Sequence, residues 1–92
     1  MIALEGDTLR LDGPIVMANV GEFLREGSVH VGGSDLTVDL SAVTEVDSSA
    51  LALLLEWRRE AARKSRKLTI RNLPVNLRTL AEVYGVVPLI GA

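Results

Sequence analysis

The feature that most constrains this chain is a strand-like segment that leads through a short polar turn into a long helix-forming segment. Residues 36–40 alternate between apolar and polar side chains and are rich in β-favouring types, which predicts a strand. Residues 51–64 contain no β-branched side chain and consist mostly of helix-favouring types, which predicts a helix. The turn between them joins two different kinds of element, and the rest of the chain is expected to support it.

Three polar residues stand in this turn, namely Asp47, Ser48 and Ser49. They belong to the types that cap helix N-termini, because their side chains accept hydrogen bonds from otherwise unpaired backbone N–H groups. We therefore expect a loop over residues 41–47 and a helix from about residue 48 to residue 64 or 65.

Composition excludes several classes of protein. The chain has 92 residues, of which 48% are apolar and 24% charged, so we expect one globular domain over residues 1–92. It has no cysteine, which excludes disulfides, thiolate metal sites and cysteine nucleophiles. The longest apolar run, residues 50–55, is too short to cross a bilayer, and no signal peptide is visible. The expectation is a cytoplasmic protein without membrane insertion.

The remaining segments alternate between strand-like and helix-like patterns. Strands are expected in a hairpin at 2–5 and 8–11 around Gly6-Asp7, and again at 67–71. Helices are expected from Pro14 to about residue 27 and from Pro74 to Gly85. Residues 28–34 predict a loop, with a brief strand at 29–31 as the alternative, and residues 86–90 predict an apolar tail laid on the core.

This order of elements predicts an α/β fold. Strands separated by helices imply parallel pairing through right-handed crossovers, and the opening hairpin adds one antiparallel pair. The expected architecture is a single small domain with a mixed sheet of about four strands backed by about three helices.

The long helix has an apolar arc on a helical wheel, comprising Leu51, Leu54, Leu55, Ala61 and Ala62. Arg58 falls within this arc, so either the helix end extends past the sheet or the stem of Arg58 packs while its head reaches water.

Leu53 and Trp57 lie at the flank of the same arc, where we expect them at the edge of the core. The alternative is that they belong to a partner surface, because a partly exposed tryptophan suits an interface anchor.

Charge is distributed unevenly along the chain. Residues 1–56 hold ten acids and two bases, a net charge of −8, whereas residues 57–92 hold eight bases and two acids, a net charge of +6. The bases concentrated near the end of the long helix are Arg58, Arg59, Arg63, Lys64, Arg66 and Lys67. One interpretation is that these cations complement the helix C-terminus. The other is a docking patch for an acidic partner or an anionic lipid; nucleic acid is disfavoured because no aromatic residues are interleaved with the bases.

These residues offer little support for independent catalysis. A serine nucleophile would need a base, and the only conventional one, His30, is not placed by its spacing near Ser48 or Ser49. Neither nucleotide-binding glycine motif is present, and one histidine without clustered carboxylates is not a metal site. We expect no catalytic residue, no metal and no cofactor.

An enzymatic alternative is a phospho-accepting receiver domain that uses Asp39, expected near the C-terminal end of its strand. Receivers need an acid cluster for Mg²⁺, and Glu5 and Asp7 are poor substitutes for it.

Ser48 is the candidate for regulation. A phosphate on its hydroxyl would bring about −1.5 to −2 charges and three acceptor oxygens to the positive end of a helix. Asp39, Glu45 and Asp47 nearby would repel that group, so phosphorylation could change partner binding without refolding the domain. The alternative is that Ser48 only caps the helix.

Residues 38–41, Val43 and residues 46–54 together resemble the signature of STAS domains, a family of anti-sigma-factor antagonists and transporter-associated regulatory modules. Residues 6–9, 51–55 and 77–84 are most similar to the small STAS subunits of Mla-type phospholipid-transport ABC complexes. The resemblance implies a STAS fold and a binding module without turnover of its own.

The resemblance also implies which residues would act. The residue that follows the loop aspartate is the phosphorylatable or partner-contacting position, which here is Ser48, and Asp47 and Ser49 flank it. A docking surface for an ABC-transporter ATPase subunit would add Leu51, Leu55 and Arg59, and would hold the protein at the inner membrane through that partner. The alternative is an anti-sigma-factor antagonist that a partner kinase switches by phosphorylating Ser48.

Overall fold

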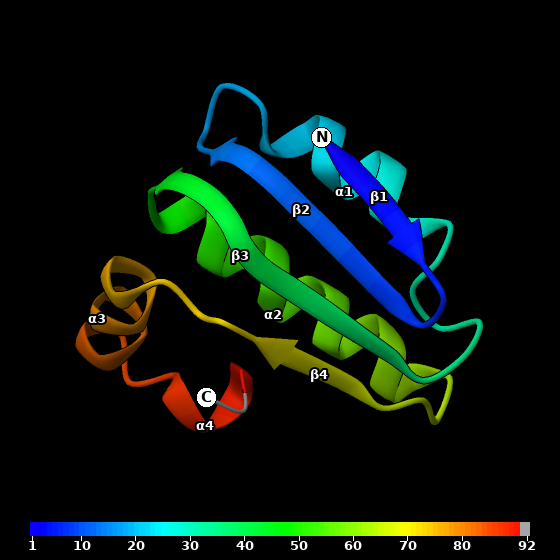
Figure 1. Cartoon of the computed structure of the whole chain (residues 1–92). Helices are drawn as coiled ribbons and strands as arrows, with labels where there is room; N and C mark the ends of the chain where they lie inside the picture. Colours follow the sequence, from blue (N-terminus) through cyan, green and yellow to red (C-terminus); the bar gives the residue numbers. More distant parts are fainter. Residues whose placement is uncertain (91–92) are drawn as a thin grey trace.

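The fold consists of one mixed sheet and four helices. The computed structural model describes residues 1–90 of the chain. Its strands are β1 (Ile2–Glu5), β2 (Thr8–Ile15), β3 (Leu36–Val46) and β4 (Leu68–Arg71), which lie in the order β1-β2-β3-β4. Its helices are α1 (Val20–Ser28), α2 (Ser48–Arg63), α3 (Val75–Val83) and α4 (Val87–Ile90). Figure 1 shows α1 and α2 behind the sheet, with α3 and α4 beyond the end of β4.

The strand pairings follow the expected mixed pattern. β1 and β2 are antiparallel and joined by a tight turn in which Gly6 has a φ of 61°, a value that glycine adopts readily. β2 pairs with β3, and β3 with β4, in parallel. Because both parallel crossovers are expected to be right-handed, α1 and α2 fall on the same face of the sheet, as Figure 1 shows. The predicted α/β architecture is confirmed.

Two strands extend further than the sequence pattern predicts. Gly13-Pro14 was expected to end the second strand and open a helix, but β2 continues to Ile15 and α1 begins at Val20. Proline is tolerated there because the pairing with β3 shifts register between Arg10 and Asp12 and again between Gly13 and Ile15. β3 likewise continues through the expected loop at 41–47 to Val46, paired with the far end of β2.

The C-terminal segment also differs from the expectation. The third helix is confirmed, with Pro74 before it and Gly85, at a φ of 70°, after it. The apolar tail is a fourth, short helix rather than an irregular segment, and its Ile90 is fully buried. In the loop at 28–34, the brief strand is reduced to an isolated bridge between Val31 and Ser34.

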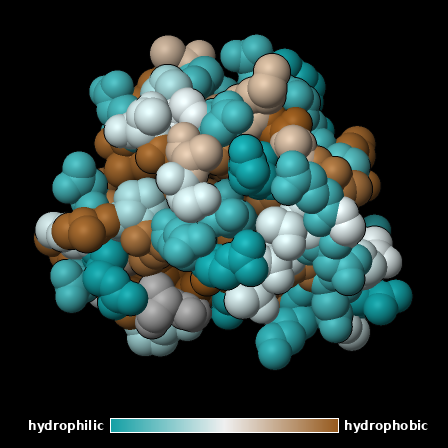
Figure 2. Space-filling model, viewed as in Figure 1, coloured by the Kyte–Doolittle hydropathy of each residue, from teal (hydrophilic) through white to brown (hydrophobic). Residues whose placement is uncertain are grey.

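The sheet has one covered and one open face. Alternate residues of the central strands, such as Leu9 and Leu11 of β2 and Val38 and Leu40 of β3, are buried beneath the helices. The residues between them point to the opposite face, which no helix of the described chain covers. In Figure 2, viewed from the side opposite to α1 and α2, hydrophilic residues occupy much of this face.

Trp57 lies at the centre of the core and not at its edge. Its side chain is 1% exposed, and Leu53, one turn earlier on α2, is 3% exposed. The expectation that these residues lie at the core edge or form a partner surface is therefore wrong. Trp57 packs against α1 at Gly27, where an added Cβ atom would stand 2.2 Å from the ring atom Cζ2. The absence of a side chain at Gly27 is what lets the two helices approach.

This packing predicts different effects for two glycines of α1. Gly27→Ala is expected to lower the free energy of unfolding by about 2–3 kcal/mol, because the new methyl group must displace Trp57. Gly21→Ala has open space around it and is expected to be neutral or to stabilise the helix by up to about 1 kcal/mol. Urea titrations of both variants measure the difference. Equal stabilities would contradict the packing at Trp57.

Candidate functional site

The start of α2 is fixed by the carboxylate of Asp47. Asp47 is the N-cap residue, with extended backbone angles, and its Oδ1 accepts a hydrogen bond from the backbone N–H of Ser49 at 2.8 Å. The Ser49 hydroxyl donates to the same oxygen. The predicted helix start is confirmed, and the cap is made by Asp47 with the help of Ser49, whose side chain is buried.

The other oxygen of Asp47 holds the loop between β2 and α1. The backbone N–H of Met17 donates to Oδ2 at 3.0 Å. Asn19 closes this loop internally, because its Oδ1 accepts from the N–H of Val16 at 2.9 Å and its Nδ2 donates to the carbonyl of Pro14 at 2.8 Å. The Ser49 hydroxyl first, and the Met17 N–H next, hold the pKa of Asp47 below its ordinary value. One ionised carboxylate thus joins the loop to the helix.

Ser48 is the exposed residue of this turn. It occupies the first position of α2 and is open to solvent, unlike Ser49. Within residues 1–90, its hydroxyl takes part in no hydrogen bond. The alternative that Ser48 serves only as the helix cap is therefore wrong, since Asp47 has that role.

An outward stripe on α2 continues from Ser48. Exposed or half-buried residues recur at Ala52, Leu55 and Arg59, which is the spacing of one helix face. Leu51 does not belong to it: the side chain lies about 60° around the helix from Ser48 and is only 3% exposed. The expectation that Leu51 contacts a partner is corrected, because it packs in the core.

Sequence reasoning missed two parts of this surface. Ala52 has the right spacing from Ser48 but carries no polar or large side chain that would attract notice. Met17, which is 74% exposed, is held beside the start of α2 by the hydrogen bond from its N–H to Asp47, a contact between residues 30 positions apart. The only local signal was Asn19, a residue type common before helices. We call Met17, Ser48, Ala52, Leu55 and Arg59 the Ser48 surface.

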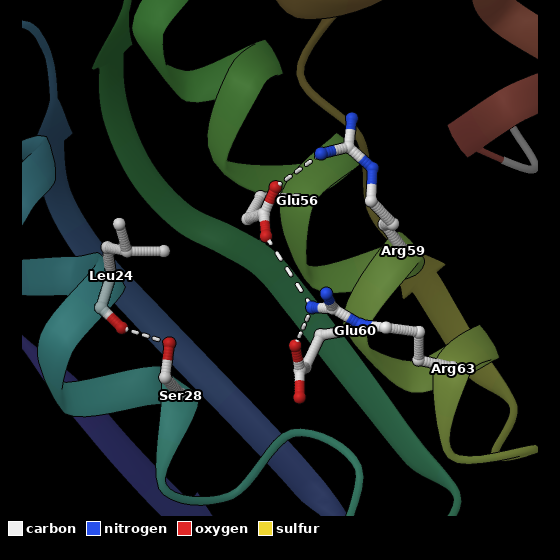
Figure 3. A network of polar contacts seen from close by, with 6 residues as sticks. All are labelled: Leu24, Ser28, Glu56, Arg59, Glu60 and Arg63. Atoms are coloured by element: carbon white, nitrogen blue, oxygen red, sulfur yellow. Dashed lines mark hydrogen bonds and ion pairs between the residues drawn. The ribbon is translucent and has the colours of Figure 1, made fainter.

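A network of ion pairs borders the Ser48 surface toward the end of α2. Glu56 pairs with Arg59 at 2.9 Å and with Arg63 at 3.9 Å, and Arg63 also pairs with Glu60. Figure 3 shows these four side chains along one side of α2, across from Leu24 and Ser28 of α1. Exposed pairs of this kind contribute little stability, but here they neutralise two of the clustered arginines.

Asp39 lies on the open face of the sheet, and both oxygens of its carboxylate have partners there. Contrary to expectation, it stands fourth of eleven residues in β3 and not near its C-terminal end. Asn72 donates to its Oδ1 at 2.9 Å, the N–H of Ser41 donates to the same oxygen at 3.0 Å, and Arg71 lies 3.6 Å from Oδ2. The Asn72 amide, followed by the Ser41 N–H, lowers the pKa of Asp39 to about 2. The carboxylate therefore fastens the end of β4 to β3.

The described residues include neither a cluster for a metal ion nor a membrane-spanning helix. Among residues 1–90, no three histidine or acidic side chains cluster in a way that could hold a metal ion. No helix in that part of the chain is long and apolar enough to cross a membrane. What the geometry does offer is a rigid, exposed hydroxyl at the start of a helix.

A family model described as "Mlab, STAS domain" matches residues 2–91 of the sequence. The chain belongs to the STAS domain family. No curated protein sequence gives a significant match to this STAS chain.

Three solved structures resemble the STAS chain in fold. A chain of the Acinetobacter MlaFEDB complex in an ATP-bound conformation matches with a TM-score of 0.82 and 23% identity, over 96% of this chain and 94% of that one. The anti-sigma-factor antagonist SpoIIAA in its unphosphorylated form matches with a TM-score of 0.75 and 17% identity, over 97% and 83%. The protein Mglu matches with a TM-score of 0.63 and 19% identity, over 82% of this chain but only 19% of its own length. At these identities the matches establish the fold.

The environment of Asp39 predicts an acid-dependent loss of stability. Its pKa in the folded state, about 2, is below the ordinary 3.8, so its contribution is complete above about pH 4 and is lost as the pH falls toward 2. Asp39→Asn is expected to be less stable at neutral pH and to lose less stability than the parent chain over that interval. Urea midpoints measured from pH 6 down to pH 2 test this.

The control for this experiment is Asp7→Asn, an exposed acid in the hairpin turn. It is expected to follow the parent chain at every pH. If the urea midpoints of Asp39→Asn and of the parent chain fell in parallel as the pH is lowered, the stabilising role of the ionised Asp39 would be contradicted.

Proposed function

We propose that this chain is a non-enzymatic STAS interaction module that docks on the ATPase subunit of a phospholipid-transport ABC complex and supports it. The match to the MlaB-type family model supports this proposal, as does the fold of a chain in the ATP-bound MlaFEDB complex. In this role the protein would work in the cytoplasm and be held at the inner membrane through its partner.

The observation that carries the proposal is the exposure of Ser48 on a surface that the fold leaves uncovered. α1, α3 and α4 pack against other sides of α2, so that none of them covers the stripe from Ser48 to Arg59. The hydroxyl is small and makes no hydrogen bond within residues 1–90, so a partner can approach it closely and bond to it. Asp47 keeps this position rigid, which reduces the ordering cost of binding.

An apolar groove extends the Ser48 surface along α2. It has a volume of about 340 Å³ and lies between α2 and α4, lined by Leu55, Arg58, Arg59, Ala62 and Leu89. Leu89 is 58% exposed, so its apolar side chain is accessible to a partner at the rim of this groove. A partner with an apolar anchor could fill this groove while it contacts Ser48, a combination typical of protein interfaces.

Substitution of Ser48 tests this surface. Ser48→Arg and Ser48→Glu each place a long charged side chain where close contact is expected, and both should reduce co-purification with the ATPase subunit at least tenfold. Neither should change the fold, because the side chain is exposed and has no partner in the described chain.

Matched controls are Ser34→Arg and Ser34→Glu, an exposed serine in the loop before β3 and therefore at the opposite end of that strand. These variants should co-purify with the ATPase like the parent chain. Full association of both Ser48 variants would reject the Ser48 surface.

A second candidate function is that of an anti-sigma-factor antagonist switched by phosphorylation. The exposed and unbonded hydroxyl of Ser48 favours it, and the fold of SpoIIAA is similar. Incubation with a candidate partner kinase and ATP should then add one phosphate at Ser48, detected by mass spectrometry, and none to Ser48→Ala. An unmodified Ser48 in the presence of an active kinase would rule out this function with that kinase.

A further inference from the structure

The outer edge of β4 is a second surface, separate from Ser48. β4 is the last strand of the sheet, and within residues 1–90 no strand pairs with its outer side. The N–H of Leu36 donates to the carbonyl of Lys67 at 2.9 Å, which assigns residues 67, 69 and 71 to the bonding with β3. Leu68 and Ile70 therefore direct their backbone N–H and C=O groups to the open edge.

Arg58 supports this assignment of the edge. Its Nη1 donates to the carbonyl of Leu68 at 2.8 Å, so this carbonyl does point outward. The sequence left open whether the head of Arg58 reaches only water. The guanidinium instead contacts the edge strand, and the residue as a whole is half-buried. A guanidinium carries five N–H donors, so further donors remain for a ligand.

A basic groove follows this edge. It has a volume of about 420 Å³ and is lined by Arg58, Ala62, Arg66, Lys67, Leu68, Thr69 and Ile70. Three of these residues are cations and none is an acid. The groove is therefore positively charged in a chain whose net charge is −2.

The cations of the groove are not neutralised by the described chain. Arg59 and Arg63 pair with Glu56 and Glu60 on another side of α2, as Figure 3 shows. No ion pair within residues 1–90 involves the three cations of the groove. Five of the six clustered bases thus separate into a neutralised pair and three that are available for an external anion, and Lys64 belongs to neither group.

We propose that the β4 edge binds an extended acidic segment of a partner protein by strand addition. The backbone of the segment pairs with the outward N–H groups of Leu68 and Ile70 and with the carbonyl of Ile70, while the carbonyl of Leu68 keeps its bond from Arg58. The carboxylates of the segment lie against Arg58, Arg66 and Lys67. Charge complementarity selects this occupant. A second copy of the chain is disfavoured at this edge, because its own β4 would bring the same cations. An anionic lipid would meet the cations but would leave the outward backbone groups unpaired.

The test uses the isolated chain and a synthetic capped peptide of alternating glutamate and valine. In an NMR titration, the amide signals of Leu68 and Ile70 are expected to shift, and hydrogen exchange at Ile70 should slow. Arg66→Glu combined with Lys67→Glu is expected to weaken binding at least tenfold. The matched control combines Arg25→Glu with Arg78→Glu, two exposed arginines on α1 and α3, and should bind like the parent chain.

A second peptide separates strand addition from simple charge attraction. It has the same sequence but carries an N-methyl group at every residue, which keeps its charge and removes the N–H donors of both edges. Tight binding of this peptide would overturn the proposal, as would the absence of binding by the unmethylated one. Binding to phosphatidylglycerol vesicles without peptide binding would assign the groove to a lipid surface instead. Because the assay contains no ATPase, its result is independent of the Ser48 surface.

Discussion

The structure depends on the placement of both crossover helices on one face of the sheet. With α1 and α2 on the same side, the whole core must form between that face and the helices, and α2 becomes its central element. α2 buries Leu54, Trp57 and Ala61, while α1 lies on one flank and α3 and α4 on the other. Within residues 1–90, these elements leave open the stripe of α2 that begins at Ser48. The exposure of this serine is thus a consequence of the topology.

The second constraint is the carboxylate of Asp47, which holds the residues at the start of that stripe in place. It accepts one hydrogen bond from the N–H of Ser49 in the first turn of α2 and another from the N–H of Met17. Because the pKa of Asp47 is lowered by these same bonds, the carboxylate stays ionised well below neutral pH and the link persists. Two segments that are distant in sequence therefore present one surface. A loop held only by its own backbone would have to be ordered by the partner, at a cost in affinity.

Local signals predicted much of the fold, and contacts between distant residues account for most of the errors. The hairpin at Gly6, the start of α2 and the end of α3 at Gly85 were predicted because a turn or cap residue marks each of them. Pro14 was misinterpreted as the start of a helix, because the register shifts that accommodate it depend on β3. The buried face of α2 was predicted at the wrong rotation about the helix axis for a similar reason. The six successive apolar residues 50–55 are compatible with several buried faces, and only the contact of Trp57 with α1 selects one of them. Leu51 was included in the apolar arc, and it was assigned to the docking surface only by the family resemblance, which also identified the family itself. Ala52 was overlooked.

The same helix connects the two surfaces that the fold leaves open. Ser48 and Arg58 are ten residues apart on α2, a separation of about 15 Å along a helix. Arg58 borders both the apolar groove beside Leu89 and the basic groove beside β4, so the two surfaces are continuous around this side chain. A partner whose body docks at Ser48 could therefore place an acidic extension along β4 without spanning a gap. Since the second contact would then be intramolecular, even a weak strand addition would increase the total affinity substantially. Weak binding of an isolated peptide to the β4 edge is thus compatible with a substantial contribution of this edge to the affinity of a complete partner.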